Sequence, residues 1–107
     1  MGYAVRSGLD PQKVLQSIGG GAAGSWALTH LAPRMLTGDF SPGFFVKHFI
    51  KDMTIAAESA RNLRLDARGL LTALEQYRRL AETGGGDDGT QALFRLYRPD
   101  QNAAASA

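Results

Sequence analysis

The longest helical pattern in this chain runs through residues 44–63, FFVKHFIKDMTIAAESARNL. At about 100° per residue, one face of such a helix collects apolar side chains over its whole length. We predict that this face belongs to the core; its members are Phe45, Phe49, Met53, Ala56, Ala60 and Leu63. The opposite side should be solvated, and its charged members are Lys47, Glu58 and Arg61.

Two apolar residues of the same segment, Phe44 and Ile55, lie on the solvated side together with His48 and Lys51. Asp52 lies at the margin between the two faces. From the pattern alone, an ordinary amphipathic border is the favoured interpretation. The alternative is a surface that meets a ligand or a second domain.

Capping signals predict two helices before this segment. Asp10 precedes Pro11 and is typical of an N-cap, so we expect a helix over residues 11–18 that ends at three glycines, 19–21. Ser25 and Gly38 suit the two caps of a helix over residues 26–37, and Pro33 inside it should kink or split it.

The pattern after residue 63 is helical as well. Asp66 is expected to cap a helix over residues 67–82, which the glycines 84–86 end. Asp87 or Asp88 is expected to cap a last short helix to Tyr97. Since no alternating run indicates a strand, the sequence predicts an all-α fold of four to five helices.

The domain organisation is predicted to be simple. Residues 1–7 have the character of the last turns of a helix that begins upstream, and residues 8–98 form one helical domain. The polar, alanine-rich residues 99–107 are expected to be a disordered tail.

Composition excludes several function classes. The 107 residues contain no cysteine, so disulfides, zinc ribbons, iron–sulfur clusters and a catalytic thiol are excluded. Only two histidines are present, without metal-ligand spacing, and no metal site is expected. The net charge of +2 comes without a basic stripe, so nucleic-acid binding is not expected. No apolar run is long enough to cross a membrane, and no secretory signal is recognised, so we expect a cytoplasmic protein without membrane contacts.

Two segments, residues 19–24 and 84–89, match GxGxxG. That pattern binds dinucleotides when it follows a strand and opens a helix, whereas both segments here follow a predicted helix, so we interpret them as connections. Trp26 is predicted to be a core or interface anchor, and His30 to be structural. No spacing of Ser, His and Asp indicates a catalytic triad.

Five segments in this order carry a family resemblance: SGLDP (7–11), GSWAL (24–28), GDFSPGF (38–44), KDMTIA (51–56) and GGDDG (85–89). Together they closely resemble the C-terminal helical domain of the β-hydroxyacid dehydrogenases, which include 3-hydroxyisobutyrate dehydrogenase and tartronate semialdehyde reductase. The resemblance implies the helical architecture of the C-terminal domain of 6-phosphogluconate dehydrogenase-like enzymes.

The resemblance also implies a function. In that family, a Rossmann domain binds NAD or NADP, and hydride passes between the nicotinamide and a small β-hydroxyacid or its semialdehyde. By resemblance, Phe44 would line the nicotinamide and substrate pocket, Lys51 would reach the cofactor, and Asp52 would orient neighbouring groups. The exposed edge of the 44–63 helix would then face the Rossmann domain, which this chain lacks.

The same resemblance places the family's catalytic lysine on the linking helix, in a Gly-x-x-Gly-x-x-x-Lys motif that this chain lacks. We therefore expect no catalytic residue here and no activity of the chain by itself. A homodimer or higher homo-oligomer is expected, because exposed apolar surface tends to be buried by self-association. The alternative function is a stand-alone helical module for protein interaction or dimerisation, which would use Phe44, His48, Lys51 and Ile55.

Overall fold

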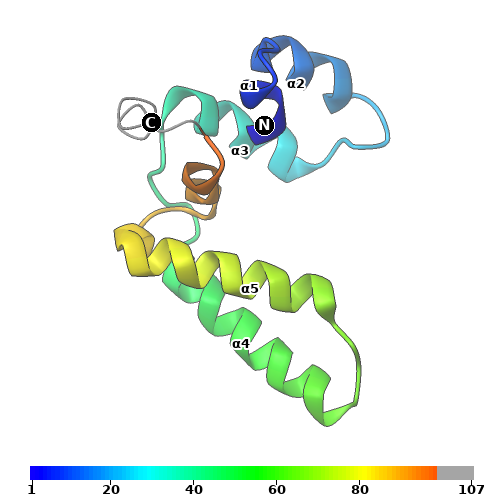
Figure 1. Cartoon of the computed structure of the whole chain (residues 1–107), viewed down its shortest axis with the longest axis vertical. Helices are drawn as coiled ribbons and strands as arrows, with labels where there is room; N and C mark the ends of the chain where they lie inside the picture. Colours follow the sequence, from blue (N-terminus) through cyan, green and yellow to red (C-terminus); the bar gives the residue numbers. More distant parts are fainter. Residues whose placement is uncertain (99–107) are drawn as a thin grey trace. The chain divides into compact units, whose positions relative to one another are not determined.

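The computed structural model describes residues 1–98, so the predicted disordered tail lies outside the described residues. Every regular element in residues 1–98 is helical, which confirms the all-α prediction (Figure 1). The α-helices are α1 (Gly2–Arg6), α2 (Pro11–Gly19), α3 (Trp26–Thr37), α4 (Val46–Asn62) and α5 (Arg68–Leu80). A π-helical turn, η1 (Ala81–Gly85), and a 3₁₀ helix, η2 (Thr90–Leu96), complete the described chain.

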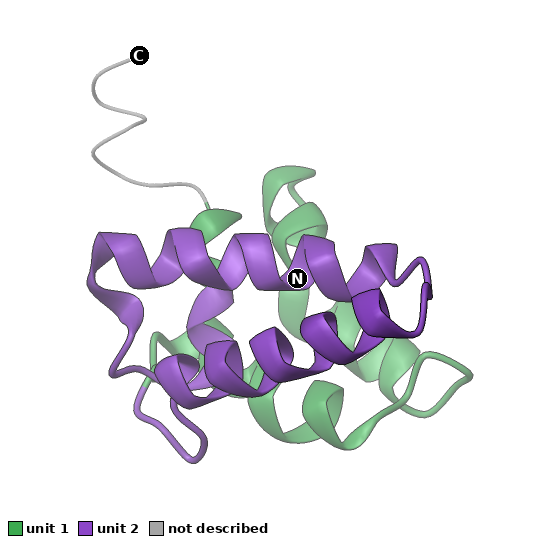
Figure 2. Cartoon of the chain, turned by 90° about the horizontal axis from the view of Figure 1, so that it is seen from below, with its two compact units in different colours: residues 1–40, 94–107 green, residues 41–93 purple. Residues whose placement is uncertain are grey.

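The described chain forms two compact units (Figure 2). The first unit contains residues 1–40 and 94–98, and the second contains residues 41–93. Helices α1, α2 and α3 belong to the first unit, and helices α4 and α5 belong to the second.

Local capping defines α2 and α3 in the first unit. The Asp10 carboxylate accepts hydrogen bonds from the backbone N–H groups of Gln12 and Lys13, at 3.0 and 3.4 Å. The Ser25 hydroxyl accepts one from the N–H of Leu28 at 2.9 Å, as an N-cap does. Gly38 ends α3 in the left-handed conformation, with φ of 76°.

Two details of this unit add to the sequence predictions. Pro33 lies inside α3 without splitting it, since the helix runs unbroken from Trp26 to Thr37. The glycine-rich segment 19–24 follows α2 and is tightly folded, because a Cβ at Gly24 would lie 2.5 Å from the Gly19 carbonyl oxygen. It is therefore a helix-to-helix connection, as interpreted from the sequence.

The second unit is built on a hairpin in which α4 and α5 run side by side (Figures 1 and 2). Its buried side chains come from both helices: Val46, Met53 and Ala60 of α4, and Leu74, Tyr77 and Leu80 of α5. The predicted core face of α4 is correct at Met53 and Ala60. It is wrong at Ala56, which is exposed, and at Leu63, which is 73% exposed. Ala57, about 100° around the helix from Ala56, is partly buried instead.

Two predicted caps differ in the structure. The N-cap of α5 is Ala67, without a side-chain hydrogen bond, because the Asp66 carboxylate pairs with Arg68 at 2.8 Å. Helix α5 ends at Leu80, and the π-helical turn η1 follows it until Gly84 adopts a φ of 96°. The predicted last helix is present as the 3₁₀ helix η2.

Candidate functional site

The candidate site lies along the exposed edge of α4. We call this surface the α4 edge and define it by Phe44, His48, Lys51, Asp52 and Ile55. Residues 48, 51, 52 and 55 lie three or four positions apart and so share one side of the helix. All five side chains are exposed, with Phe44 at 44% and Ile55 at 58%. The structure therefore confirms that the apolar members of this edge face away from the hairpin core.

The N-terminus of α4 is capped by backbone atoms from about 40 residues further along the chain. No side chain caps this helix. Instead, the N–H of Val46 donates to the carbonyl of Asp88 at 2.8 Å, and the N–H of Lys47 donates to that of Gly86 at 3.0 Å. These first-turn N–H groups have no partner inside the helix, so the 84–89 segment supplies the acceptors that they need.

Phe44 is held in position by the same segment. Its carbonyl oxygen accepts a hydrogen bond from the N–H of Thr90 at 3.2 Å. A single antiparallel bridge pairs the next residue, Phe45, with Gly89. The backbone that carries the exposed ring is thus fixed by the turn between η1 and η2.

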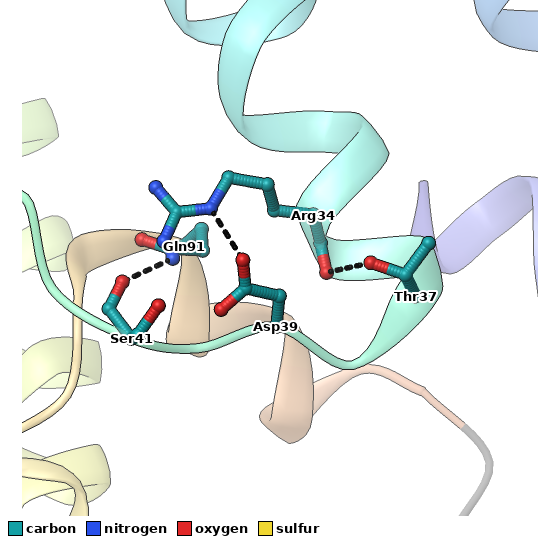
Figure 3. Close-up of polar contacts among 5 residues, drawn as sticks. All are labelled: Arg34, Thr37, Asp39, Ser41 and Gln91. Carbon is teal, nitrogen blue, oxygen red and sulfur yellow. Dashed lines mark hydrogen bonds and ion pairs between the residues drawn. The ribbon is translucent and has the colours of Figure 1, made fainter.

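A side-chain hydrogen bond from Gln91 stabilises this turn. The buried Gln91 side chain donates from Nε2 to the Ser41 carbonyl oxygen at 2.9 Å (Figure 3). Gly89 lies against it, since a Cβ there would be 2.3 Å from Gln91 Oε1 and 2.9 Å from the Ser41 oxygen. Sequence reasoning missed Gln91, because glutamine is usually a surface residue and no local pattern marks this one as buried.

An aromatic series runs from the α4 edge into the core. The Phe44 ring meets Phe49 edge-on at 5.8 Å, and Phe49 meets Tyr77 in the same way at 5.0 Å. The Tyr77 hydroxyl donates to the Thr90 carbonyl at 2.8 Å, and burial raises the pKa of this phenol above its usual value. The exposed Phe44 ring therefore packs on the half-buried Phe49 ring, which in turn contacts the buried Tyr77.

Some charged groups of α4 take part in an ion pair, and others have none recorded among residues 1–98. Lys47 pairs with Asp87 at 2.7 Å, and this hydrogen bond lowers the pKa of the Asp87 carboxyl. Among residues 1–98, in contrast, the structure records no ion pair for Lys51 or Asp52. The His48 ring contacts Phe45 edge-on at 5.4 Å. The α4 edge thus presents an aromatic ring, an ammonium group and a carboxylate on one side of the helix.

Trp26 was predicted to be a core or interface anchor, and the structure excludes the core alternative. It is 67% exposed and stacks on His30 at 4.5 Å, with the two rings 15° apart. The His30 Nδ1 is 2.9 Å from the Trp26 carbonyl oxygen, so this nitrogen donates the hydrogen bond. The pair lies in the first unit, whereas the α4 edge belongs to the second.

Two other kinds of site have no candidate among the described residues. Residues 1–98 contain no group of three or more side chains suited to hold a metal ion. None of their helices is long and apolar enough to cross a membrane.

Comparison with known proteins decides the family. Residues 1–97 match the protein family described as NAD-binding of NADP-dependent 3-hydroxyisobutyrate dehydrogenase. The chain belongs to this family. The predicted resemblance is thereby confirmed.

Individual relatives agree with this assignment. The chain is 54% identical over 97 residues to YkwC, an uncharacterized oxidoreductase of Bacillus subtilis, and covers 34% of that protein. It is 34% identical over 93 residues to 2-hydroxy-3-oxopropionate reductase of Escherichia coli, covering 32% of that enzyme. The chain therefore spans about a third of the length of the relatives that it matches.

A solved structure supports the fold. The crystal structure of a 3-hydroxyisobutyrate dehydrogenase from Salmonella typhimurium superposes with a TM-score of 0.85 at 24% identity. The match covers 90% of this chain and 34% of that enzyme. The helical fold of this family member is therefore the one that the sequence predicted.

Proposed function

We propose that this chain is the substrate-side helical domain of an NAD(P)-dependent β-hydroxyacid dehydrogenase. The reaction is hydride transfer between a nicotinamide and a small 3-hydroxyacid or its semialdehyde. The observation that carries the proposal is the α4 edge, in a chain whose family is described as NAD-binding. Residues 1–7 would be the end of the linking helix, and residues 8–98 the domain itself.

The chemistry of the α4 edge fits a nicotinamide dinucleotide. Such a cofactor has a flat ring that needs an apolar neighbour, and phosphates that need a positive charge. The half-exposed Phe44 ring, held against Phe49, offers the apolar neighbour. Lys51 offers the positive charge, and its lack of an ion pair in residues 1–98 leaves the charge available.

The cofactor supplies the hydride chemistry when it is bound, and the residues of this chain position and shield it. Phe44 excludes water from one side of the reacting ring. Lys51 binds a negatively charged group, and Asp52, the next residue along the edge, orients neighbouring donors. No residue here is proposed as the proton donor to the substrate oxygen, so the chain by itself is expected to be inactive.

The test is an NMR titration of the ¹⁵N-labelled chain with NADPH and NADH. We expect weak, millimolar binding that shifts the amide signals of residues 44–55 and becomes weaker in Lys51→Ala. The matched control is Lys13→Ala, which removes an exposed lysine of α2 in the other unit. Shifts confined to other segments, or equal effects of both substitutions, would contradict the proposal.

A steady-state assay tests the expected inactivity. The chain is assayed with each cofactor and with 3-hydroxyisobutyrate, glycerate and their semialdehydes. Clear turnover by the 107-residue chain would show that it contains a proton donor that the proposal does not assign.

A second function is proposed on the exposure of Ile55. A branched apolar side chain that is 58% exposed is suited to a homodimer contact. Sedimentation equilibrium of the chain and of Ile55→Asp tests this: the substitution should weaken the dimer at least tenfold. A wild-type chain that sediments as a monomer at every concentration tested would exclude this proposal.

A cytoplasmic location stays a prediction that cell fractionation can check.

A further inference from the structure

The connection between α4 and α5 exposes two leucines. We call residues 61–68 the hairpin tip, because they end α4 and begin α5 (Figure 1). Leu63 is 73% exposed and Leu65 is 63% exposed, and the two lie in one turn. A single exposed leucine is common on a protein surface, whereas two in the same turn give an apolar surface that is open to solvent.

The backbone of the hairpin tip is fixed by the end of α4. The N–H of Arg64 donates to the Arg61 carbonyl at 3.0 Å, and the N–H of Leu65 donates to the Ala60 carbonyl at 2.9 Å. These are the two hydrogen bonds of a Schellman motif, in which an apolar residue at the position of Leu65 frequently packs on the last helical turn. Because Leu65 stays exposed, this motif holds its side chain in solvent.

Arg64 occupies the left-handed position of the motif, with a φ of 55°. Glycine is the usual residue there, because a Cβ is strained in that conformation. An arginine at this position costs stability, and backbone strain of this kind is concentrated at functional sites. Its side chain is exposed, and no ion pair is recorded for it among residues 1–98. We therefore assign this side chain to contacts outside the chain.

The hairpin tip is the positive part of a neutral unit. Residues 61–68 contain three arginines and one acidic residue, a net charge of +2. The remaining part of the second unit has four basic and six acidic residues, a net charge of −2. Asp66 pairs with Arg68 at 2.8 Å, so the excess positive charge of the tip comes from Arg61 and Arg64. The exposed leucines are thus accompanied by positive charge.

We propose that the hairpin tip docks a protein segment that combines acidic and apolar side chains, as an amphipathic helix of Glu and Leu does. Apolar side chains of this segment cover Leu63 and Leu65, and its carboxylates pair with Arg61 and Arg64. Arginine is suited to such a contact, because its guanidinium group binds a carboxylate through two hydrogen bonds while its stem packs on apolar groups.

Other occupants fit the hairpin tip less well. A second copy presents the same net positive charge, so two tips repel each other. An anionic bilayer attracts the arginines, but it repels the exposed Asp66 carboxylate, which follows Leu65 directly in the turn. A protein segment can cover the leucines and leave the Asp66–Arg68 pair in solvent at the rim of the contact.

This proposal is independent of the function proposed for the α4 edge. Lys51 and Asn62 are eleven residues apart on α4, which corresponds to about 16 Å along the helix axis. Signals of residues 61–68 therefore report on the hairpin tip, and signals of residues 44–55 report on the cofactor.

The test is an NMR titration of the ¹⁵N-labelled 107-residue chain with an amphipathic helical peptide of Glu and Leu. The comparison probes are the same peptide with Lys in place of Glu, and vesicles of phosphatidylcholine and phosphatidylglycerol in equal parts. We expect the acidic peptide to shift the signals of residues 61–68 in a saturable manner and to bind more weakly as salt rises. The basic peptide should give no saturable shift.

Two variants and a control locate the contact. Leu63→Ser should weaken binding of the acidic peptide about tenfold, because it removes an apolar contact. Arg64→Gly should weaken it about threefold, although it relieves the left-handed strain and so stabilises the fold. A variant that is more stable and binds more weakly separates loss of binding from loss of fold. The matched control, Arg79→Gln, neutralises an exposed arginine at the other end of α5 and should leave the affinity unchanged.

Four results would overturn the proposal. Equal binding of the acidic and basic peptides, or equal effects of Arg79→Gln and Arg64→Gly, would show that the charge of the tip does not select the partner. Shifts of residues 61–68 with the vesicles but not with the acidic peptide would assign the tip to a bilayer. Shifts of the same residues that grow with chain concentration, without any effect of the peptide, would assign it to a second copy.

Discussion

Replacing Gly89 by alanine tests how the α4 edge is positioned. The added methyl group would lie 2.3 Å from Gln91 Oε1 and 2.9 Å from the Ser41 carbonyl oxygen. The Gln91 side chain is buried and cannot rotate into solvent, and the second contact is with backbone. The substitution therefore has to displace the turn that caps α4 and holds Phe44.

The expected loss of stability comes from two sources. Overpacking of a closely packed site costs about 1–3 kcal/mol. Loss of the Gln91–Ser41 hydrogen bond adds about 0.5–1.5 kcal/mol. Together these give about 1.5–4.5 kcal/mol. Each kcal/mol corresponds to roughly 4–8 °C in Tm for a domain of this size.

Urea unfolding followed by circular dichroism measures this loss. The matched control is Gly43→Ala, since a Cβ at Gly43 meets no atom within 4 Å and its φ is not positive. We expect this control to lie within about 0.5 kcal/mol of the wild type, as surface substitutions usually do. A Gly89→Ala variant that is as stable as the control would refute the argument that this turn positions α4.

Three further predictions follow from single contacts. Because pairing with Lys47 lowers the folded-state pKa of Asp87, the pair stabilises the fold above the unfolded-state pKa, and this contribution is lost as pH falls through the folded-state pKa. Asp87→Asn should therefore be less stable than the wild type at pH 7 and equal to it in strong acid, as thermal melts across pH will show; a difference that persists at low pH would contradict this. Tyr77→Phe removes the hydrogen bond to Thr90 and should cost about 0.5–1.5 kcal/mol in urea unfolding, and no loss would mean that water replaces the bond. Arg64 has a φ of 55°, so Arg64→Gly should stabilise the chain by about 1 kcal/mol in the same assay, whereas Arg64→Ala should not.

Helices whose ends have local signals were predicted closely from the sequence. For α2 and α3, the prediction differs from the structure by at most one residue, because Asp10, Ser25 and Gly38 satisfy backbone groups within a few residues of themselves. Local chemistry is sufficient there, since the cap and the helix that it ends belong to the same short segment. The candidate site residues Phe44, Lys51 and Asp52 were found by resemblance, and their roles stay predictions.

What the sequence by itself determined is the all-α class, the caps of α2 and α3, and the family. Only the tertiary structure decided where the edge of the buried face of α4 lies, because Ala56 and Ala57 are equally apolar and only Ala57 is partly buried. It also decided how α4 begins, because the carbonyls of Gly86 and Asp88 are about 40 residues away from the N–H groups that they accept. Contacts between distant segments leave no periodic signal in the sequence, so Gln91 and the exposed Trp26 could be recognised only once the chain was folded.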